Sequence, residues 1–127
     1  MLNADVLLTN SSTIRDLVLK GQTVVAPLLR SDGMYSNFWA GITAEYYYVR
    51  TDLYEPILFR EKTGCHNVPM VHRAVLIDLR RYDSDRLTYK AEKLIAYNGP
   101  EDDIITFAVG ANKSSKYLKF HLSHLLY

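Results

Sequence analysis

The sequence contains little of what marks several common protein classes. Cys65 is the only cysteine among 127 residues, so no disulfide can form within the chain and the redox compartment is not indicated. Lys and Arg number 15 against 14 Asp and Glu, and the net charge of +1 gives no electrostatic argument for nucleic acid or an anionic membrane as a partner. The chain has no run of about 18 apolar residues, which excludes a transmembrane helix.

Motifs for several kinds of chemistry are absent as well. Neither G-x-x-x-x-G-K nor G-x-G-x-x-G occurs, and no serine or cysteine lies in a nucleophile elbow. The composition is that of an ordinary globular protein, with 48% hydrophobic and 23% charged residues. A chain of this length is long enough to bury one core. Composition and periodicity therefore indicate one α/β domain over residues 1–127, and any function must come from short motifs.

The hydrophobic pattern predicts alternating strands and helices. A continuous β-branched run at 23–29 predicts a strand covered on both faces, within a parallel or mixed sheet. Helical spacing before Gly21 predicts a helix at 13–20, and Pro100 suits the first turn of a helix at 101–112. Further strands are expected at 4–8, 36–42, 45–50, 86–90 and 117–122, and 68–79 is expected to be a strand that runs into a helix.

Two pairs of polar residues are candidates for chemistry. Asn3 and Asp5 offer two oxygen ligands on one side of the chain, as a D-x-D motif does for a divalent metal, although N-x-D is a common pattern. Asp102 and Asp103 open the predicted helix at 101–112, where carboxylates either stabilise the helix dipole or act as a general base. Spacing alone favours the purely structural explanation for both pairs.

The histidines and the glycosylation sequons are weaker signals. His66 and His72 flank V-P-M without making a zinc site, and His121 and His124 point to opposite faces of a predicted strand. Sequons begin at Asn10 and at Asn112, but about one is expected by chance in this length, so they barely favour a secretory origin.

The order of the short motifs resembles the N-terminal region of the procollagen galactosyltransferases. The matching blocks are N-A-D at 3–5, V-V-A-P-L-L at 24–29, Y-S-N-F-W at 35–39, V-P-M-V-H at 68–72, L-I-D-L-R at 76–80 and D-D-I-I at 102–105. They follow in order and spacing from residue 3 to about residue 120. Y-S-N-F-W and V-P-M-V-H are unusual words, which makes the resemblance specific. The related cerebral endothelial cell adhesion molecule carries similar blocks, so the resemblance does not by itself imply activity.

The resemblance implies an incomplete GT-A glycosyltransferase fold, a Rossmann-like mixed sheet that keeps the acceptor-side half. In that family, galactose passes from UDP-galactose to hydroxylysine of collagen, with inversion and with manganese, in the endoplasmic reticulum lumen. Asp5 matches the last Asp of the family's metal-binding D-x-D, and Asn3 stands in place of the first. Asp102 and Asp103 match the acceptor-side pair, from which the base for the acceptor hydroxyl is expected.

Trp39 and His72 lie in the two unusual words and are the substrate-binding residues that the resemblance implies. We also expect departures from the family, because the sequence begins at the D-x-D: a fragment or degenerate relative without the family's signal peptide, retention signal and second transferase domain. We therefore expect a partial and inactive domain with an exposed sheet edge that favours oligomers. The alternative function is a non-catalytic adhesion or interaction module whose aromatic surface holds collagen or a partner chain.

Overall fold

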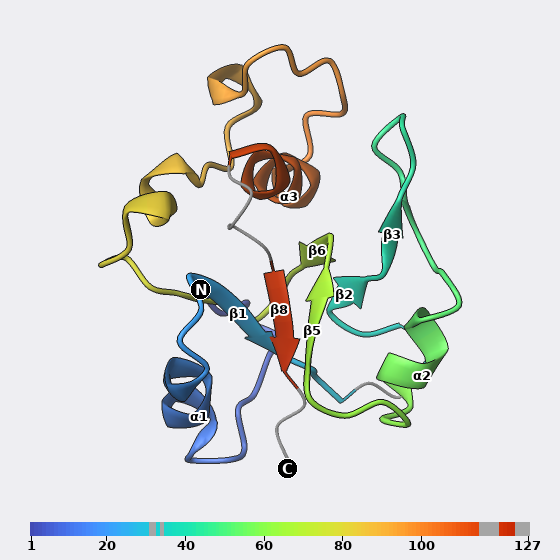
Figure 1. Ribbon diagram of the computed structural model, residues 1–127, viewed down its shortest axis with the longest axis vertical. Helices are drawn as coiled ribbons and strands as arrows, with labels where there is room; N and C mark the ends of the chain where they lie inside the picture. Colours follow the sequence, from blue (N-terminus) through green and yellow to red (C-terminus); the bar gives the residue numbers. More distant parts are fainter. Residues whose placement is uncertain (31–32, 34, 115–119, 124–127) are drawn as a thin grey trace.

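The computed structural model describes residues 1–30, 33, 35–114 and 120–123 (Figure 1). Its helices and strands are short and alternate along the chain. In order they are α1 (Thr13–Leu19), β1 (Val24–Pro27), β2 (Phe38–Trp39), β3 (Gly41–Ile42), β4 (Tyr48–Val49), α2 (Tyr54–Leu58), β5 (Cys65–Val68), β6 (Met70–Val71), β7 (Leu76–Ile77), the 3-10 helices η1 (Tyr82–Arg86) and η2 (Ala91–Lys93), α3 (Asp103–Ser114) and β8 (Phe120–Ser123).

The main sheet is mixed, as the sequence predicts. Its strand order is β5-β8-β1-β7, with β1 parallel to β8 and antiparallel to β7. The pairs β2–β6 and β3–β4 form two small antiparallel sheets. Within the described residues β5 and β7 are the edges of the main sheet, and the expectation that an edge favours oligomers stays a prediction.

Strand β1 lies at the centre of the core. All four of its residues are buried, which confirms that the apolar run at 23–29 is covered on both faces. Val24 belongs to the same hydrophobic cluster as Phe107 of α3, whereas Val25 packs with Leu17 of α1 in a second cluster. Successive side chains point to opposite faces of a strand, so α1 and α3 cover β1 from opposite sides. In Figure 1 α3 lies toward the top of the view and α1 at the lower left, with the main sheet between them.

The two helices expected from periodicity are confirmed. Helix α1 is followed by Gly21 at φ 65°, the left-handed conformation that commonly ends a helix. Helix α3 begins at Asp103, two residues later than predicted. The strand predicted at 117–122 is confirmed where β8 begins at Phe120, and its residues 117–119 lie outside the described ones.

The strand predicted at 4–8 is wrong. These residues form no strand, and Leu7 is 83% exposed. Both positions beside β1 are occupied by β7 and β8, so β1 has no edge left to pair with a preceding segment. Only Leu2 makes an isolated bridge in this region, antiparallel to Ala74.

The helix predicted toward 79 and the strand predicted at 86–90 are also wrong. Pro69 separates β5 from β6, and Arg73 takes a left-handed φ of 68° that no helix or strand accommodates. The following residues, Leu76 and Ile77, instead pair with β1. Residues 82–86 form η1, and no strand follows at 87–90. In place of the strands expected at 36–42 and 45–50, the structure has the two-residue strands β2, β3 and β4. Helix α2 forms where the sequence pattern predicts no helix.

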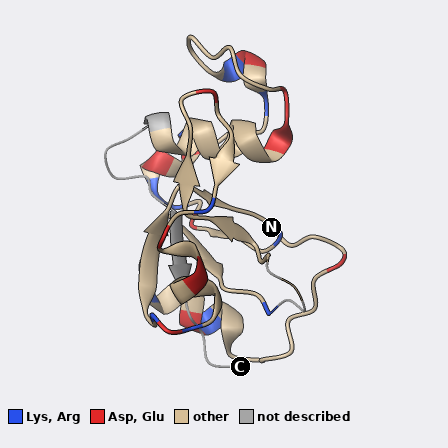
Figure 2. Cartoon of the chain, turned by 90° about the vertical axis from the view of Figure 1, so that its right-hand side faces the viewer, with Lys and Arg blue, Asp and Glu red and all other residues tan. Residues whose placement is uncertain are grey.

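In the view of Figure 2, charged residues of both signs are spread along the ribbon. This agrees with the net charge of +1. Among the helices within residues 1–30, 33, 35–114 and 120–123, none has the length and apolar character needed to cross a membrane.

Candidate functional site

The N-terminal segment is held beside the turn that follows β6. The backbone N–H of Asn3 donates to the Arg73 carbonyl at 2.7 Å. The amino group of Met1 donates to the Val75 carbonyl at 2.8 Å, and the N–H of Val75 donates back to Met1 at 2.9 Å. These bonds explain how residues without strand structure still place Asn3 and Asp5 next to Arg73.

Arg73 faces the predicted metal ligand. Its guanidinium Nη1 lies 3.9 Å from Oδ2 of Asp5, and the two side chains are 50% and 64% exposed. A separation of this size between exposed groups makes a weak ion pair. The carboxylate that the sequence assigns to a metal therefore has a cation as its partner.

Asp5 and Arg73 line one cavity, the Asp5 cavity, with a volume of about 430 Å³. It lies past the carboxyl end of β1, the edge at which open α/β sheets bind ligands. Its wall comes from the N-terminal segment, the residues after β1 and the residues before β2. The lining residues are Asp5, Val6, Leu7, Leu8, Thr9, Leu29, Arg30, Ser36, Asn37 and Arg73.

Asn37, from the Y-S-N-F-W block, fixes the shape of this cavity. It is fully buried, and its Nδ2 donates to the Pro27 carbonyl at 2.8 Å. Its Oδ1 accepts from the Leu29 N–H at 3.0 Å and from the Ser36 hydroxyl at 3.0 Å. One side chain thus joins the end of β1 to the start of β2, which is a structural role that the sequence pattern did not reveal.

The two predicted substrate-binding residues do not line the Asp5 cavity. The backbone N–H of His72 donates to the Asn37 carbonyl at 2.9 Å. Burial, with a smaller contribution from Arg73, lowers the pKa of His72, which favours its neutral imidazole. Trp39 is half-buried and its ring lies 5.8 Å from that of Tyr54 and 5.8 Å from that of Tyr35, between centroids. Neither side chain is therefore among the lining residues of the Asp5 cavity.

The paired carboxylates at the start of α3 have different surroundings. Oδ1 of Asp102 accepts from the N–H groups of Ile104 at 3.0 Å and Ile105 at 3.2 Å, which is N-terminal helix capping. Asp103 instead lines a second cavity of about 540 Å³, the Asp103 cavity, with Tyr89 and Glu101 among its other lining residues. Burial, and secondarily the charge of Asp103, raises the pKa of Tyr89. The sequence does not distinguish the roles of the two aspartates, whereas the structure assigns capping to Asp102 and a place in a cavity wall to Asp103.

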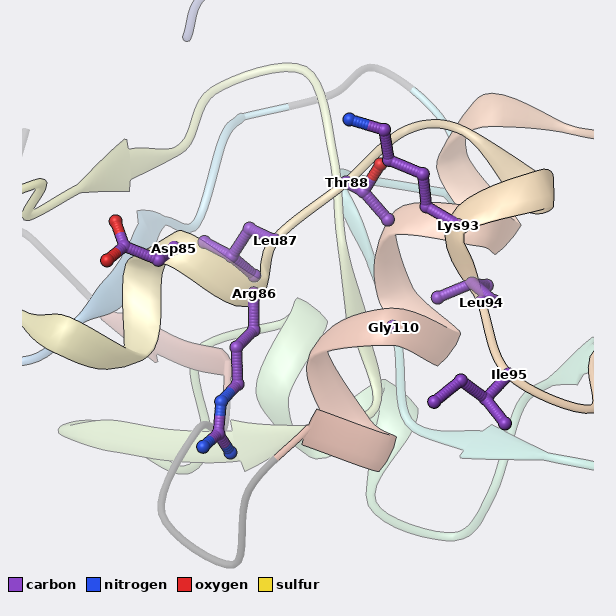
Figure 3. Close-up of a pocket in the computed structure, with 8 residues that line it drawn as sticks. All are labelled: Asp85, Arg86, Leu87, Thr88, Lys93, Leu94, Ile95 and Gly110. Carbon is purple, nitrogen blue, oxygen red and sulfur yellow. The ribbon is translucent and has the colours of Figure 1, made fainter.

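The structure does not bring the two predicted pairs together. Asp5 and Asp103 line separate cavities. A further cavity of about 460 Å³ lies between η1, residues 87–95 and Gly110 of α3. There the guanidinium of Arg86 and the ammonium of Lys93 point to different sides (Figure 3).

The donors near Asp5 do not by themselves fit a manganese site. Asn3 contributes no charge, and Asp5 is paired with Arg73. In the part of the chain that the structure describes, no three His, Cys, Asp or Glu side chains gather closely enough to hold an ion. Divalent cations prefer several oxygen ligands of negative or dipolar character. Manganese binding by this chain therefore stays a prediction.

Sequence reasoning missed the arginines of the Asp5 cavity. Arg30 follows β1 and Arg73 follows β6, and neither belongs to a motif with a recognisable spacing. Their common position depends on tertiary pairing, so no local signal could have found them.

Comparisons with known proteins identify relatives over nearly the whole chain. Residues 1–124 match the model of the N-terminal domain of glycosyltransferase family 25. A glycosyltransferase 25 family member of Aedes aegypti is 54% identical over 116 residues, which are 90% of this chain and 19% of that protein. Procollagen galactosyltransferase 1-B of Xenopus laevis is 48% identical over 113 residues, 89% of this chain and 18% of that protein. Procollagen galactosyltransferase 2 of Homo sapiens is 44% identical, with the same coverage of both chains.

The chain spans about a fifth of the length of these curated relatives. Its mixed α/β fold is compatible with part of a glycosyltransferase domain. The matched residues include the Asp5 cavity and the start of α3. On these grounds the chain belongs to glycosyltransferase family 25 and matches the N-terminal domain of that family.

Proposed function

We propose that this chain is part of a transferase that moves galactose from UDP-galactose to the hydroxyl group of hydroxylysine in collagen. The names of the Xenopus laevis and Homo sapiens relatives support the sugar and the acceptor protein. The observation that carries the proposal is the division of labour at the start of α3, where Asp102 caps the helix and Asp103 lines a cavity. A carboxylate that is not needed for capping is available for chemistry.

In the proposed reaction, donor and acceptor together span the Asp5 and Asp103 cavities, and the carboxylate of Asp103 accepts the proton of the acceptor hydroxyl. The acceptor oxygen then bonds to the anomeric carbon of galactose, and the bond from that carbon to the diphosphate oxygen breaks. Attack from the face opposite the leaving diphosphate inverts the anomeric configuration and releases UDP. Asp103 is the first residue of α3, where the helix dipole stabilises the negative charge that a base must carry.

The proposal extends to fold and location. A mixed sheet with a cavity at the carboxyl end of its central strand supports a GT-A domain, of which residues 1–127 form one part. An acceptor in collagen, before its secretion, supports the endoplasmic reticulum lumen as the compartment.

A non-catalytic interaction module is the second candidate, because one aromatic group is accessible at the surface. Tyr35 is 53% exposed, and the guanidinium carbon of Arg50 lies 5.0 Å from the centre of its ring. The ring centroids of Tyr35 and Trp39 lie 5.8 Å apart. Aromatic and arginine side chains are enriched at binding interfaces, so this group could hold a partner chain.

The two candidates differ in a transfer assay. The matching segment of Xenopus laevis procollagen galactosyltransferase 1-B is replaced by this chain, and labelled galactose is followed from UDP-galactose to a hydroxylysine-containing collagen peptide. We expect transfer within about tenfold of the parent, a difference of about 1.4 kcal/mol in the barrier. The matched control is the same peptide with lysine, which lacks the hydroxyl and should receive no galactose. A folded chimera that transfers nothing to hydroxylysine would refute the enzyme and favour the interaction module.

A further inference from the structure

The Asp5 cavity contains two cations that no motif assigns. Arg30 and Arg73 both line it and both are exposed, while Asp5 is the one carboxylate among the lining residues that the structure describes. Thr9, which is also exposed, adds a hydroxyl to the wall. Among the described lining residues, cations therefore outnumber carboxylates by two to one, although the whole chain is close to neutral.

The ion pair inside the cavity is weak enough to exchange its partner. The 3.9 Å between Arg73 Nη1 and Asp5 Oδ2 is too long for a hydrogen bond, and both side chains are at least half exposed. A phosphate group offers a guanidinium two parallel hydrogen bonds with more negative charge than one carboxylate. A diphosphate can therefore compete with Asp5 for Arg73.

The backbone at Arg73 is strained at this position. Its φ of 68° lies in the left-handed region, which is unfavourable for a residue other than glycine. The bond from the Asn3 N–H to the Arg73 carbonyl, at 2.7 Å, helps to hold that conformation. Strained residues of this kind gather at ligand clamps, where the surrounding structure enforces them.

We infer that the Asp5 cavity binds the diphosphate of the sugar donor directly through Arg30 and Arg73, without a metal ion bound by this chain. The identity of the ligand as a nucleoside diphosphate sugar rests on the proposed function. The poor fit of Asn3 and Asp5 to a metal site agrees with this inference, because the arginines supply the positive charge that a metal would otherwise bring. Asp5 then acts as the partner that holds Arg73 until the diphosphate arrives.

Titration calorimetry of the 127-residue chain with inorganic diphosphate, in excess EDTA, tests the inference. Arg73→Asn is the first variant, because asparagine tolerates the left-handed conformation and removes the charge. We expect it and Arg30→Ala each to weaken binding by about tenfold or more, whereas Arg73→Lys should keep part of the affinity. The matched control Arg15→Ala removes an exposed arginine of α1 that does not line the cavity, and should change nothing.

Asp5→Asn separates arginine binding from metal binding. If the arginines bind the diphosphate, removing the competing carboxylate should tighten binding in EDTA. Weaker binding in this variant would overturn the inference, and so would binding that needs added Mn²⁺, equal affinity in Arg73→Asn, or no binding by the parent chain. Circular dichroism of each variant establishes that it is folded.

The same variants distinguish this inference from the proposed function. Diphosphate binding that depends on Arg73, together with a chimera that transfers no galactose, would leave the inference standing and remove the function. Galactose transfer that is unchanged by Arg73→Asn would support the function and overturn the inference.

Discussion

Asp103→Asn in the chimeric enzyme should reduce galactose transfer by about a hundred- to ten-thousandfold, the range for losing a general base. The side chain keeps its size and its place at the first residue of α3, so the fold should be retained. The structural reason for the expected loss is that Asp103 lines a cavity, whereas its neighbour is occupied with the helix end. Initial rates of labelled-galactose transfer, with thermal melting of the same sample, measure both effects.

Asp102 supplies the matched control. Asparagine caps a helix about as well as aspartate, so Asp102→Asn should leave both transfer and stability nearly unchanged. Asp102→Ala removes the acceptor for the Ile104 and Ile105 N–H groups and should cost about 1 kcal/mol of stability. Undiminished transfer in Asp103→Asn, or a loss confined to Asp102 variants, would assign the base elsewhere.

Asn37→Ala should lower the free energy of unfolding by about 2–4 kcal/mol, because it leaves buried backbone groups without partners. The Leu29 N–H and the Pro27 carbonyl both lose the amide that now satisfies them. Urea denaturation followed by Trp39 fluorescence measures the change. The control Asn67→Ala alters an exposed asparagine in β5 and should stay within about 0.5 kcal/mol. A cost below about 1 kcal/mol at Asn37 would show that the cavity wall does not depend on this side chain.

The parts of the fold that the sequence predicts are those with local signals. Helices α1 and α3 follow a helical period, and β1 follows a continuous apolar run that the core covers on both faces. The strand expected at 4–8 also has a largely apolar pattern, interrupted by Asp5. It does not form, because β7 and β8 come from much later in the chain and occupy both sides of β1. No local signal in residues 4–8 carries that information.

The candidate site shows the same limit. Asp5 and Asp103 can be singled out because they belong to recognisable motifs, and the structure places each in a cavity. Arg73 meets Asp5 only because the N-terminal segment bonds to the turn after β6. Asn37 appears as part of an unusual word, but its buried hydrogen bonds to the end of β1 depend on tertiary structure. Pairings between distant segments therefore decide which residues face the cavity.

The most direct test of the account is amide hydrogen exchange of the chimeric enzyme with and without UDP-galactose. The central claim is that the Asp5 cavity receives the donor. We expect slower exchange on donor binding at residues 3–9, 28–30 and 72–75, which surround that cavity, and unchanged exchange at 85–88 and 93–95 around the separate cavity beside η1. Donor-dependent protection at 85–88 and 93–95 with none at 3–9 and 72–75 would contradict the claim.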